Sequence, residues 1–191
     1  PGDCFDVAIE AWRIATECMV PVMILSDGYI ANGSEPWKIP SFDELPKIEI
    51  RHPEGTDPEE PFLPYARDEN LARPWAIPGT PGLMHRVGGL EKEDGTGNVS
   101  YDPANHQHMT DTRSNKVAKI AERIPDQEVY GDQTGDLLLV SWGGTYGACH
   151  TAVKRCRDQG HAVSHLHLRY INPMPANIGQ LLGNFKKVAV A

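Results

Sequence analysis

Apolar residues recur at helical spacing in the first part of the chain. They are Phe5, Ala8, Ile9, Trp12, Ala15 and Met19. This spacing lays one apolar stripe along a helix, so residues 3–19 are predicted to be helical. The run Val20–Leu25 that follows is apolar and rich in branched residues, and the polar Ser26, Asp27 and Gly28 close it. It is predicted to be a buried strand that ends in a polar loop.

Apolar runs and a helical stripe alternate from residue 136 onward. Leu137–Val140 is an unbroken apolar run, as expected of a parallel strand covered on both faces. A glycine-rich turn, Gly143–Gly147, leads to a stripe at helical spacing that Gly160 ends. A second strand, a short helix and the start of a third strand are predicted at Ala162–Leu168, Pro175–Leu182 and Val188–Ala191. The fold class is therefore α/β, with a parallel βαβαβ unit.

The stretch between these regions is proline-rich. Pro36 to Pro81 contains ten prolines, acidic patches at Glu54 and Asp57–Glu60, and almost no hydrophobic periodicity. Proline removes a backbone donor and restrains the residue before it, so this stretch is predicted to be an extended connector. Its aromatic residues are expected to pack on neighbouring domains or subunits. They are Trp37, Phe42, Phe62, Tyr65 and Trp75.

A glycine-rich loop and a second helix follow the connector. Gly79–Gly97 is predicted to be an exposed loop or hairpin. At Asp102, an N-cap acid precedes a proline at the first helical position, which is a clear helix start. The helix is predicted to continue to about Arg123, because Pro125 ends it.

Composition narrows the class of function. The net charge is −8, and no Lys/Arg run is present, so neither nucleic acid nor an anionic membrane surface is expected as a partner. No apolar run approaches the length of a membrane span. The four cysteines form no CxxC pair and all fall within predicted helices, which favours reduced thiols and a cytoplasmic location.

Two segments are candidate sites. Asp27 and Gly28 follow a predicted strand, where α/β sheets place ligands, although Asp27 is equally suited to be a helix cap. Gly143, Gly144 and Thr145 follow the Leu137–Val140 strand. Bare backbone N–H groups there can hold phosphate, but neither nucleotide-binding glycine motif is present, so a tight strand-to-helix turn is the main alternative.

The histidines indicate a functional site less strongly than these two segments do. His165 and His167 alternate on one predicted strand and so share a face, as in some metal sites. No Cys or carboxylate at ligand spacing accompanies them, and packing is the favoured interpretation. Cys149 and His150 are adjacent on a helix and point apart, so they form no nucleophile pair.

Longer patterns carry a family resemblance. The segment Cys4–Ala8 and the segment Val20–Ala31 resemble the end of the pyrimidine-binding domain in alpha subunits of 2-oxoacid:ferredoxin oxidoreductases, especially the 2-oxoglutarate type. Gly135–Thr145 and His167–Pro175 resemble the transketolase C-terminal-like domain of that family. The resemblance divides the chain into residues 1–35, the end of a pyrimidine-type domain; 36–101, a connector and loop; and 102–191, a truncated transketolase C-terminal-like domain.

The resemblance implies oxidative decarboxylation of a 2-oxoacid by thiamine diphosphate, capture of the acyl group by coenzyme A, and electron delivery through iron-sulfur clusters to ferredoxin. In the family, the diphosphate with Mg and the clusters belong mainly to the partner beta subunit. The chain has no Gly-Asp-Gly thiamine motif and no cysteine set for a cluster. The chain is therefore expected to be a piece of a longer subunit, inactive alone, with its family's catalytic residues outside it.

Within that framework, Asp27 and Gly28 are expected near the thiamine cleft, and Gly143, Gly144 and Thr145 at a domain interface. Two other functions are left open by the residues: a different transketolase-like thiamine enzyme, and a noncatalytic docking or assembly domain. The identity of the 2-oxoacid, the physiological direction and the subunit stoichiometry are open as well.

Overall fold

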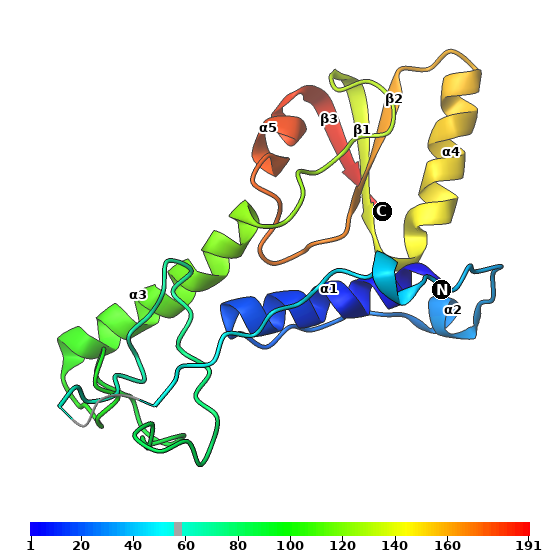
Figure 1. The fold of residues 1–191 in the computed structure, drawn as a ribbon. Coiled ribbons are helices and arrows are strands. Elements are labelled where there is room, and N and C mark those ends of the chain that lie inside the picture. The colour runs from blue at the N-terminus through cyan, green and yellow to red at the C-terminus, as the bar shows by residue number, and fades with distance from the viewer. Residues whose placement is uncertain (56–58) are drawn as a thin grey trace. The chain divides into compact units, whose positions relative to one another are not determined.

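The computed structural model describes residues 1–55 and 59–191, and Figure 1 shows its helices and strands. Residues 56–58, which include part of the acidic patch at Asp57–Glu60, lie outside the described residues. Contacts divide the chain into two compact units. The sheet unit comprises Pro1–Phe5, Ile24–Trp37 and Ala121–Ala191, and the connector unit comprises Asp6–Met23 and Lys38–Ile120.

A parallel sheet with strand order β2-β1-β3 forms the sheet unit. The strands are β1 (Gly135–Trp142), β2 (Val163–Leu168) and β3 (Phe185–Val190). Helix α4 (Tyr146–Asp158) joins β1 to β2 and packs on both, and α5 (Ile178–Gly183) joins β2 to β3. The predicted α/β class and the βαβαβ order are confirmed. The third strand and the short helix begin at residues other than those predicted.

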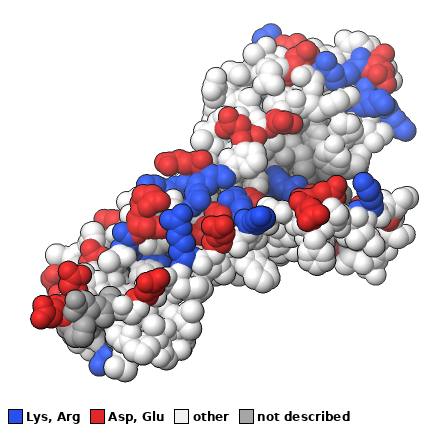
Figure 2. All heavy atoms as spheres, in the orientation of Figure 1, with Lys and Arg blue, Asp and Glu red and all other residues white. Residues whose placement is uncertain are grey.

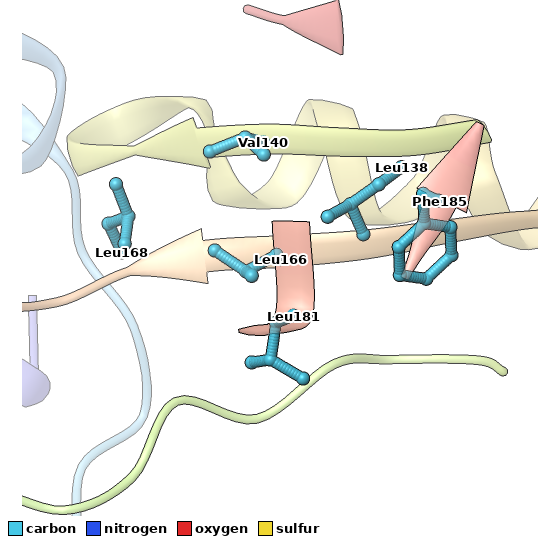
Figure 3. Packing of buried hydrophobic residues seen from close by; sticks show 6 residues of the cluster. All are labelled: Leu138, Val140, Leu166, Leu168, Leu181 and Phe185. Carbon is cyan, nitrogen blue, oxygen red and sulfur yellow. The ribbon is translucent and has the colours of Figure 1, made fainter. Parts of the chain in front are cut away.

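The central strand carries the core. The buried cluster consists of Leu138, Val140, Leu166, Leu168, Leu181 and Phe185. Figure 3 shows these side chains, which come from β1, β2, α5 and the start of β3. Leu138 and Leu166 are fully shielded from solvent, and a fully buried leucine stabilises the fold by about 1.5–3 kcal/mol. Strand β1 lies between β2 and β3, and its Leu138 and Val140 side chains are buried while Leu137 and Leu139 are half-buried.

Two long helices match their predictions closely. Helix α1 spans Asp3–Cys18, and its outer face holds Arg13 between two acids, with Arg13 Nη2 2.7 Å from Glu10 Oε1. Helix α3 spans Pro103–Lys119, and the Asp102 carboxylate accepts hydrogen bonds from two backbone N–H groups of its first turn. A 3-10 turn, Ile120–Glu122, continues α3 to the predicted end. Polar capping at Asp102 therefore fixes where the helix begins.

The predicted strand at Val20–Leu25 is wrong. These residues have no regular secondary structure, and Met23 and Leu25 are 87% and 75% exposed. Within the described ranges, no strand pairs with them. An apolar run becomes a buried strand only where neighbouring strands complete its backbone hydrogen bonds and cover its side chains. Val20–Leu25 has the composition of a strand, but no described strand is placed to be its partner.

Most of the connector unit is irregular, as predicted. Between residues 36 and 101 the structure describes one 3-10 turn, Phe42–Glu44, and isolated bridges that include Lys92 with Val99. This bridge forms a small hairpin that starts inside the predicted loop Gly79–Gly97 and ends just after it. On the face that Figure 2 displays, Lys and Arg side chains are interleaved with Asp and Glu.

Some of the connector aromatics contact other parts of the chain, and packing on neighbouring domains or subunits stays a prediction. Trp75 Nε1 donates a hydrogen bond to the Thr16 carbonyl of α1, 2.7 Å away, and Phe62 packs edge-on against His85. Phe42, by contrast, is almost fully exposed. Among the residues that the structure describes, no helix is both long enough and apolar enough to cross a membrane.

Candidate functional site

The turn after β1 is shaped by a left-handed glycine. Gly143 has a φ of +62°, a conformation that residues with a Cβ rarely adopt, and Gly143–Thr145 forms a single 3-10 turn before α4. The Thr145 hydroxyl donates to the Trp142 carbonyl, 2.7 Å away. The turn therefore closes on the last residue of the strand and holds its backbone at the carboxyl edge of the sheet.

Asp27 caps a short helix. It precedes α2 (Gly28–Asn32), and its Oδ1 accepts a hydrogen bond from the Ile30 N–H at 2.8 Å. The Asp27 carbonyl also accepts from Ala31 N–H at 3.0 Å. The capping alternative raised by the sequence is therefore what the structure shows. Gly28 has open space where a Cβ would stand, so packing does not require glycine there.

The two candidate segments meet. A Cβ built on Gly144 would lie 2.9 Å from Asp27 Cγ and closer still to Oδ2. A real Cβ does not come that close, so Gly144 is needed to let the Asp27 carboxylate lie against the turn. Gly144 does not itself take a positive φ, because the left-handed residue of this turn is Gly143.

The end of β2 contributes a cation to the same edge. Trp142 and Leu168 are register partners, so Gly143 and Arg169 follow the two strands at the same level of the sheet. Arg169 Nη1 lies 2.7 Å from Asp3 Oδ1 at the start of α1. Arg169 was not among the candidates chosen from the sequence, although its position directly after a parallel strand was a usable signal.

A polar network lies on the adjacent part of the sheet. The Ser141 hydroxyl is fully buried and lies 2.8 Å from both His165 Nε2 and His167 Nδ1. The shared face predicted for the two histidines is confirmed. The roles of Ser141 and of His150, whose ring packs against Tyr130, were missed because they depend on strand register and helix placement.

Burial keeps this network neutral near pH 7. Burial lowers the pKa of His165, and His167 and His150 lower it further. Burial also lowers the pKa of His167, although Asp3 opposes that change. A hydroxyl has one proton to donate, so at most one histidine accepts from Ser141 while the other donates to it. The hydrogen bonds of Ser141 with the two histidines form a structural network, as the packing interpretation expected, while Nδ1 of the neighbouring His150 is buried without a partner among the described residues.

The site does not offer a set of ligands for a metal ion. The described residues, 1–55 and 59–191, contain no group of three or more His, Cys, Asp or Glu side chains placed to hold one. One Asp27 oxygen is already engaged by the α2 backbone. A diphosphate bound through Mg²⁺ therefore does not fit this part of the sheet edge, and the residues shown here serve to hold segments together.

Comparisons with known proteins give a consistent result. The family described as "Pyruvate flavodoxin/ferredoxin oxidoreductase, thiamine diP-bdg" matches residues 1–102. The chain is 53% identical, over 98% of its length, to the 2-oxoglutarate oxidoreductase subunit KorA of Mycobacterium tuberculosis. It is 30% identical, over 96% of its length, to the alpha subunit of 2-oxoacid:ferredoxin oxidoreductase 1 of Aeropyrum pernix.

A solved structure resembles the whole chain. It is the 2-oxoglutarate:ferredoxin oxidoreductase from Magnetococcus marinus, with 2-oxoglutarate, coenzyme A and succinyl-CoA bound. The TM-score is 0.84 at 29% identity, over 98% of this chain and 32% of that one. The chain likewise spans 28% of the mycobacterial relative and 29% of the Aeropyrum relative.

Proposed function

Because the chain belongs to the family of pyruvate flavodoxin/ferredoxin oxidoreductase thiamine diphosphate-binding domains, we propose that it is part of the alpha subunit of a 2-oxoacid:ferredoxin oxidoreductase. The enzyme would decarboxylate a 2-oxoacid oxidatively, transfer the acyl group to coenzyme A and pass electrons to ferredoxin. Of the 2-oxoacids, 2-oxoglutarate is the proposed substrate. The single observation that carries this choice is 53% identity to a 2-oxoglutarate oxidoreductase subunit along nearly the whole chain.

The proposed division of the chain follows its three segments. Residues 1–35 would end a pyrimidine-type domain, 36–101 would form the connector and loop, and 102–191 would begin a transketolase C-terminal-like domain. The family match over residues 1–102 supports the first two segments, since it ends where the third is proposed to begin. The parallel sheet formed by β1, β2 and β3 supports the third.

The proposed role of the Asp27–Gly28 segment is to support the thiamine cleft from behind. Thiamine supplies the carbanion chemistry when it is bound, and the protein must hold the ring in place. This chain contributes a fixed support: Asp27 caps α2 and lies against Gly144, while the turn Gly143–Thr145 fixes the edge of the sheet. In the full subunit, Gly143, Gly144 and Thr145 would line a domain interface.

The proposed partners lie beyond this chain. A beta subunit would hold the diphosphate with Mg and the iron-sulfur clusters, because the residues described here provide neither a metal site nor a cysteine set. Ferredoxin is an acidic protein in this reaction class and this chain has a net charge of −8, so ferredoxin is expected to dock elsewhere. The four cysteines form no disulfide, which supports a reducing, cytoplasmic location.

Co-expression tests this proposal against a transketolase-like enzyme. The full-length subunit would be tagged and purified with its partner, and the complex examined by absorption and electron paramagnetic resonance spectroscopy. A 2-oxoacid:ferredoxin oxidoreductase contains iron-sulfur clusters that 2-oxoglutarate and coenzyme A reduce. A complex that turns over a sugar phosphate and has no cluster would instead support the transketolase-like function.

A further inference from the structure

Two guanidinium groups flank one aromatic ring in the connector unit. Arg73 Cζ lies 4.6 Å from the centroid of the Tyr65 ring, and Arg67 Cζ lies 5.7 Å from it. Helix α3 lies against the same segment, since Lys119 Nζ donates to the Glu69 carbonyl at 2.6 Å, and Lys116 of α3 is close enough for both arginines to act on its charge. Its side chain is buried, with the residue only 9% exposed. Three cationic side chains therefore share one partly buried location.

The acids near this cluster are occupied elsewhere. Asp68 Oδ1 accepts hydrogen bonds from the backbone N–H groups of Asn70 and Ala72. Asp94 pairs with His108, and Glu91 pairs with both Arg113 and His106. Across residues 1–55 and 59–191, no carboxylate lies within ion-pair distance of Arg67, Arg73 or Lys116. Asp94 acts on the charge of Arg67 and Asp68 on that of Lys116, but neither lies within ion-pair distance in the described part of the chain.

Packing unpaired cations together is unfavourable, and the pKa values show it. Burial, together with the charges of Arg67 and Arg73, lowers the pKa of Lys116 from 10.5 to about 8. Burial, followed by the charge of Arg73, also lowers the pKa of Arg67. A bound anion would relieve this repulsion, because an opposite charge nearby favours the charged form of each group.

The cluster also has hydrogen-bond donors to spare. Arg67 Nε is buried and has no partner, while its Nη1 donates to the Leu71 carbonyl at 2.8 Å. Lys116 Nζ donates one hydrogen bond to the Met19 carbonyl at 2.9 Å, which helps to end α1, and an ammonium group has two more to give. Capping α1 explains one donor of Lys116 but neither arginine.

We propose that Arg67, Arg73 and Lys116 form a binding site for an oxyanion, namely a carboxylate or phosphate group of a small molecule. Arginine and lysine donors match the oxygens of both groups, and charge-assisted hydrogen bonds are the strong ones. Tyr65 holds the two guanidinium groups at its ring, so that the arginines are positioned before the anion arrives. The site does not depend on the proposed enzyme activity.

Calorimetric titration of the full-length protein, assembled with its partner, tests the site. The probes are inorganic phosphate and succinate at constant ionic strength, with sodium chloride as the blank. Arg73→Gln and Lys116→Met should each weaken binding about tenfold or more, as expected for a lost charge-assisted hydrogen bond. Lys119→Gln is the matched control, since its Nζ donates only to the Glu69 carbonyl on the exposed side of α3.

The two probes distinguish the two ligand chemistries. Tighter binding of phosphate indicates a phosphate-bearing ligand, and tighter binding of succinate indicates a carboxylate-bearing one. Thermal unfolding without anion checks that each variant is folded. Absence of saturable binding for both probes overturns the proposal, as does binding that Arg73→Gln and Lys116→Met leave unchanged.

A pH series adds a readout that a purely structural role would not change. The charged and titratable groups that act on Lys116 are Arg67, Arg73, Asp68 and Cys18. The affinity for succinate, whose carboxylates stay ionised, should fall from about pH 7 to about pH 9.5 as Lys116 loses its proton. Lys116→Arg stays charged and should bind with little change over this range. An equal fall in Lys116→Arg would contradict the role assigned to Lys116.

Discussion

The carboxylate of Asp27 lies directly against the backbone of Gly144, where no side chain fits. The same carboxylate caps α2 through the Ile30 N–H. One acid therefore fixes two things: the start of a short helix and the position of that helix against the turn that follows β1. Both segments were candidate sites in the sequence, and the structure joins them into one.

Gly144→Ala should destabilise the full-length subunit. The new Cβ would displace the Asp27 carboxylate, and a forced rearrangement of this kind costs about 1–3 kcal/mol of unfolding free energy. Urea unfolding followed by circular dichroism would measure it. Gly147→Ala is the matched control, because a Cβ at Gly147 has open space and alanine favours its helix. Equal losses for both variants would contradict the contact.

The contact itself can be isolated by a double-mutant cycle. Asp27→Ala removes the carboxylate and the cap, at a cost of about 0.5–2 kcal/mol. Once the carboxylate is gone, Gly144→Ala should cost much less than it does alone, because the colliding group is absent. Additive effects would show that Asp27 and Gly144 act independently. The measurement is the unfolding free energy of all four proteins under the same conditions.

Asp27→Asn separates a capping role from a role near the cofactor. Asparagine caps helices about as well as aspartate, so stability should change by only a few tenths of a kcal/mol. If Asp27 supports the thiamine cleft, the apparent Kd for thiamine diphosphate should rise while the variant stays folded. Fluorescence titration of the assembled complex would measure this. Unchanged cofactor binding would restrict Asp27 to capping and packing.

Ser141→Ala should weaken the core of the sheet. It leaves His165 and His167 without their shared partner in a buried place, and an unsatisfied buried polar group costs about 1–3 kcal/mol. Ser164→Ala serves as the control, because Ser164 makes a single hydrogen bond to the Asp132 carbonyl. The unfolding free energy should be highest for the wild type, lower for Ser164→Ala and lowest for Ser141→Ala. The reverse order of the two variants would contradict the network.

Acid should destabilise the sheet unit before most carboxylates titrate. Burial lowers the pKa values of His165 and His167 in the folded protein below the ordinary value of 6.5. Between the folded and unfolded pKa values the unfolded chain binds more protons, so stability is full above about pH 6.5 and falls as the pH is lowered through that window. Urea unfolding between about pH 7.5 and 5 would show it, and His165→Asn should reduce the slope. An unchanged slope would contradict the contribution of His165 to this loss of stability.

Local signals in the sequence predicted the strands of the sheet and the ends of several helices. The unbroken run Leu137–Val140 indicated a strand buried on both faces, and β1 is flanked by β2 and β3. Asp102 before Pro103 marked the start of α3, because capping needs only neighbouring residues. Gly160, with a φ of +86°, marked the end of α4 for the same reason.

Features that depend on distant residues were not predictable. Val20–Leu25 has the composition of a strand, but composition does not show whether partner strands are present to pair with it. Gly144 is glycine because Asp27 approaches it from far along the chain, which no local pattern in the sequence reveals. Likewise, the contact of Ser141 with the histidines follows from the parallel register, which pairs Ser141 with His167 and could not be predicted from local sequence.

Coenzyme-A-dependent dye reduction by the full-length subunit with its partner tests the central claim most directly. Initial rates would be measured with 2-oxoglutarate, pyruvate and a branched-chain 2-oxoacid at matched concentrations, each with and without coenzyme A. We expect reduction that requires coenzyme A and is fastest with 2-oxoglutarate. No reduction with any of the three 2-oxoacids, from a complex that is folded and contains its thiamine diphosphate and clusters, would contradict the proposed function.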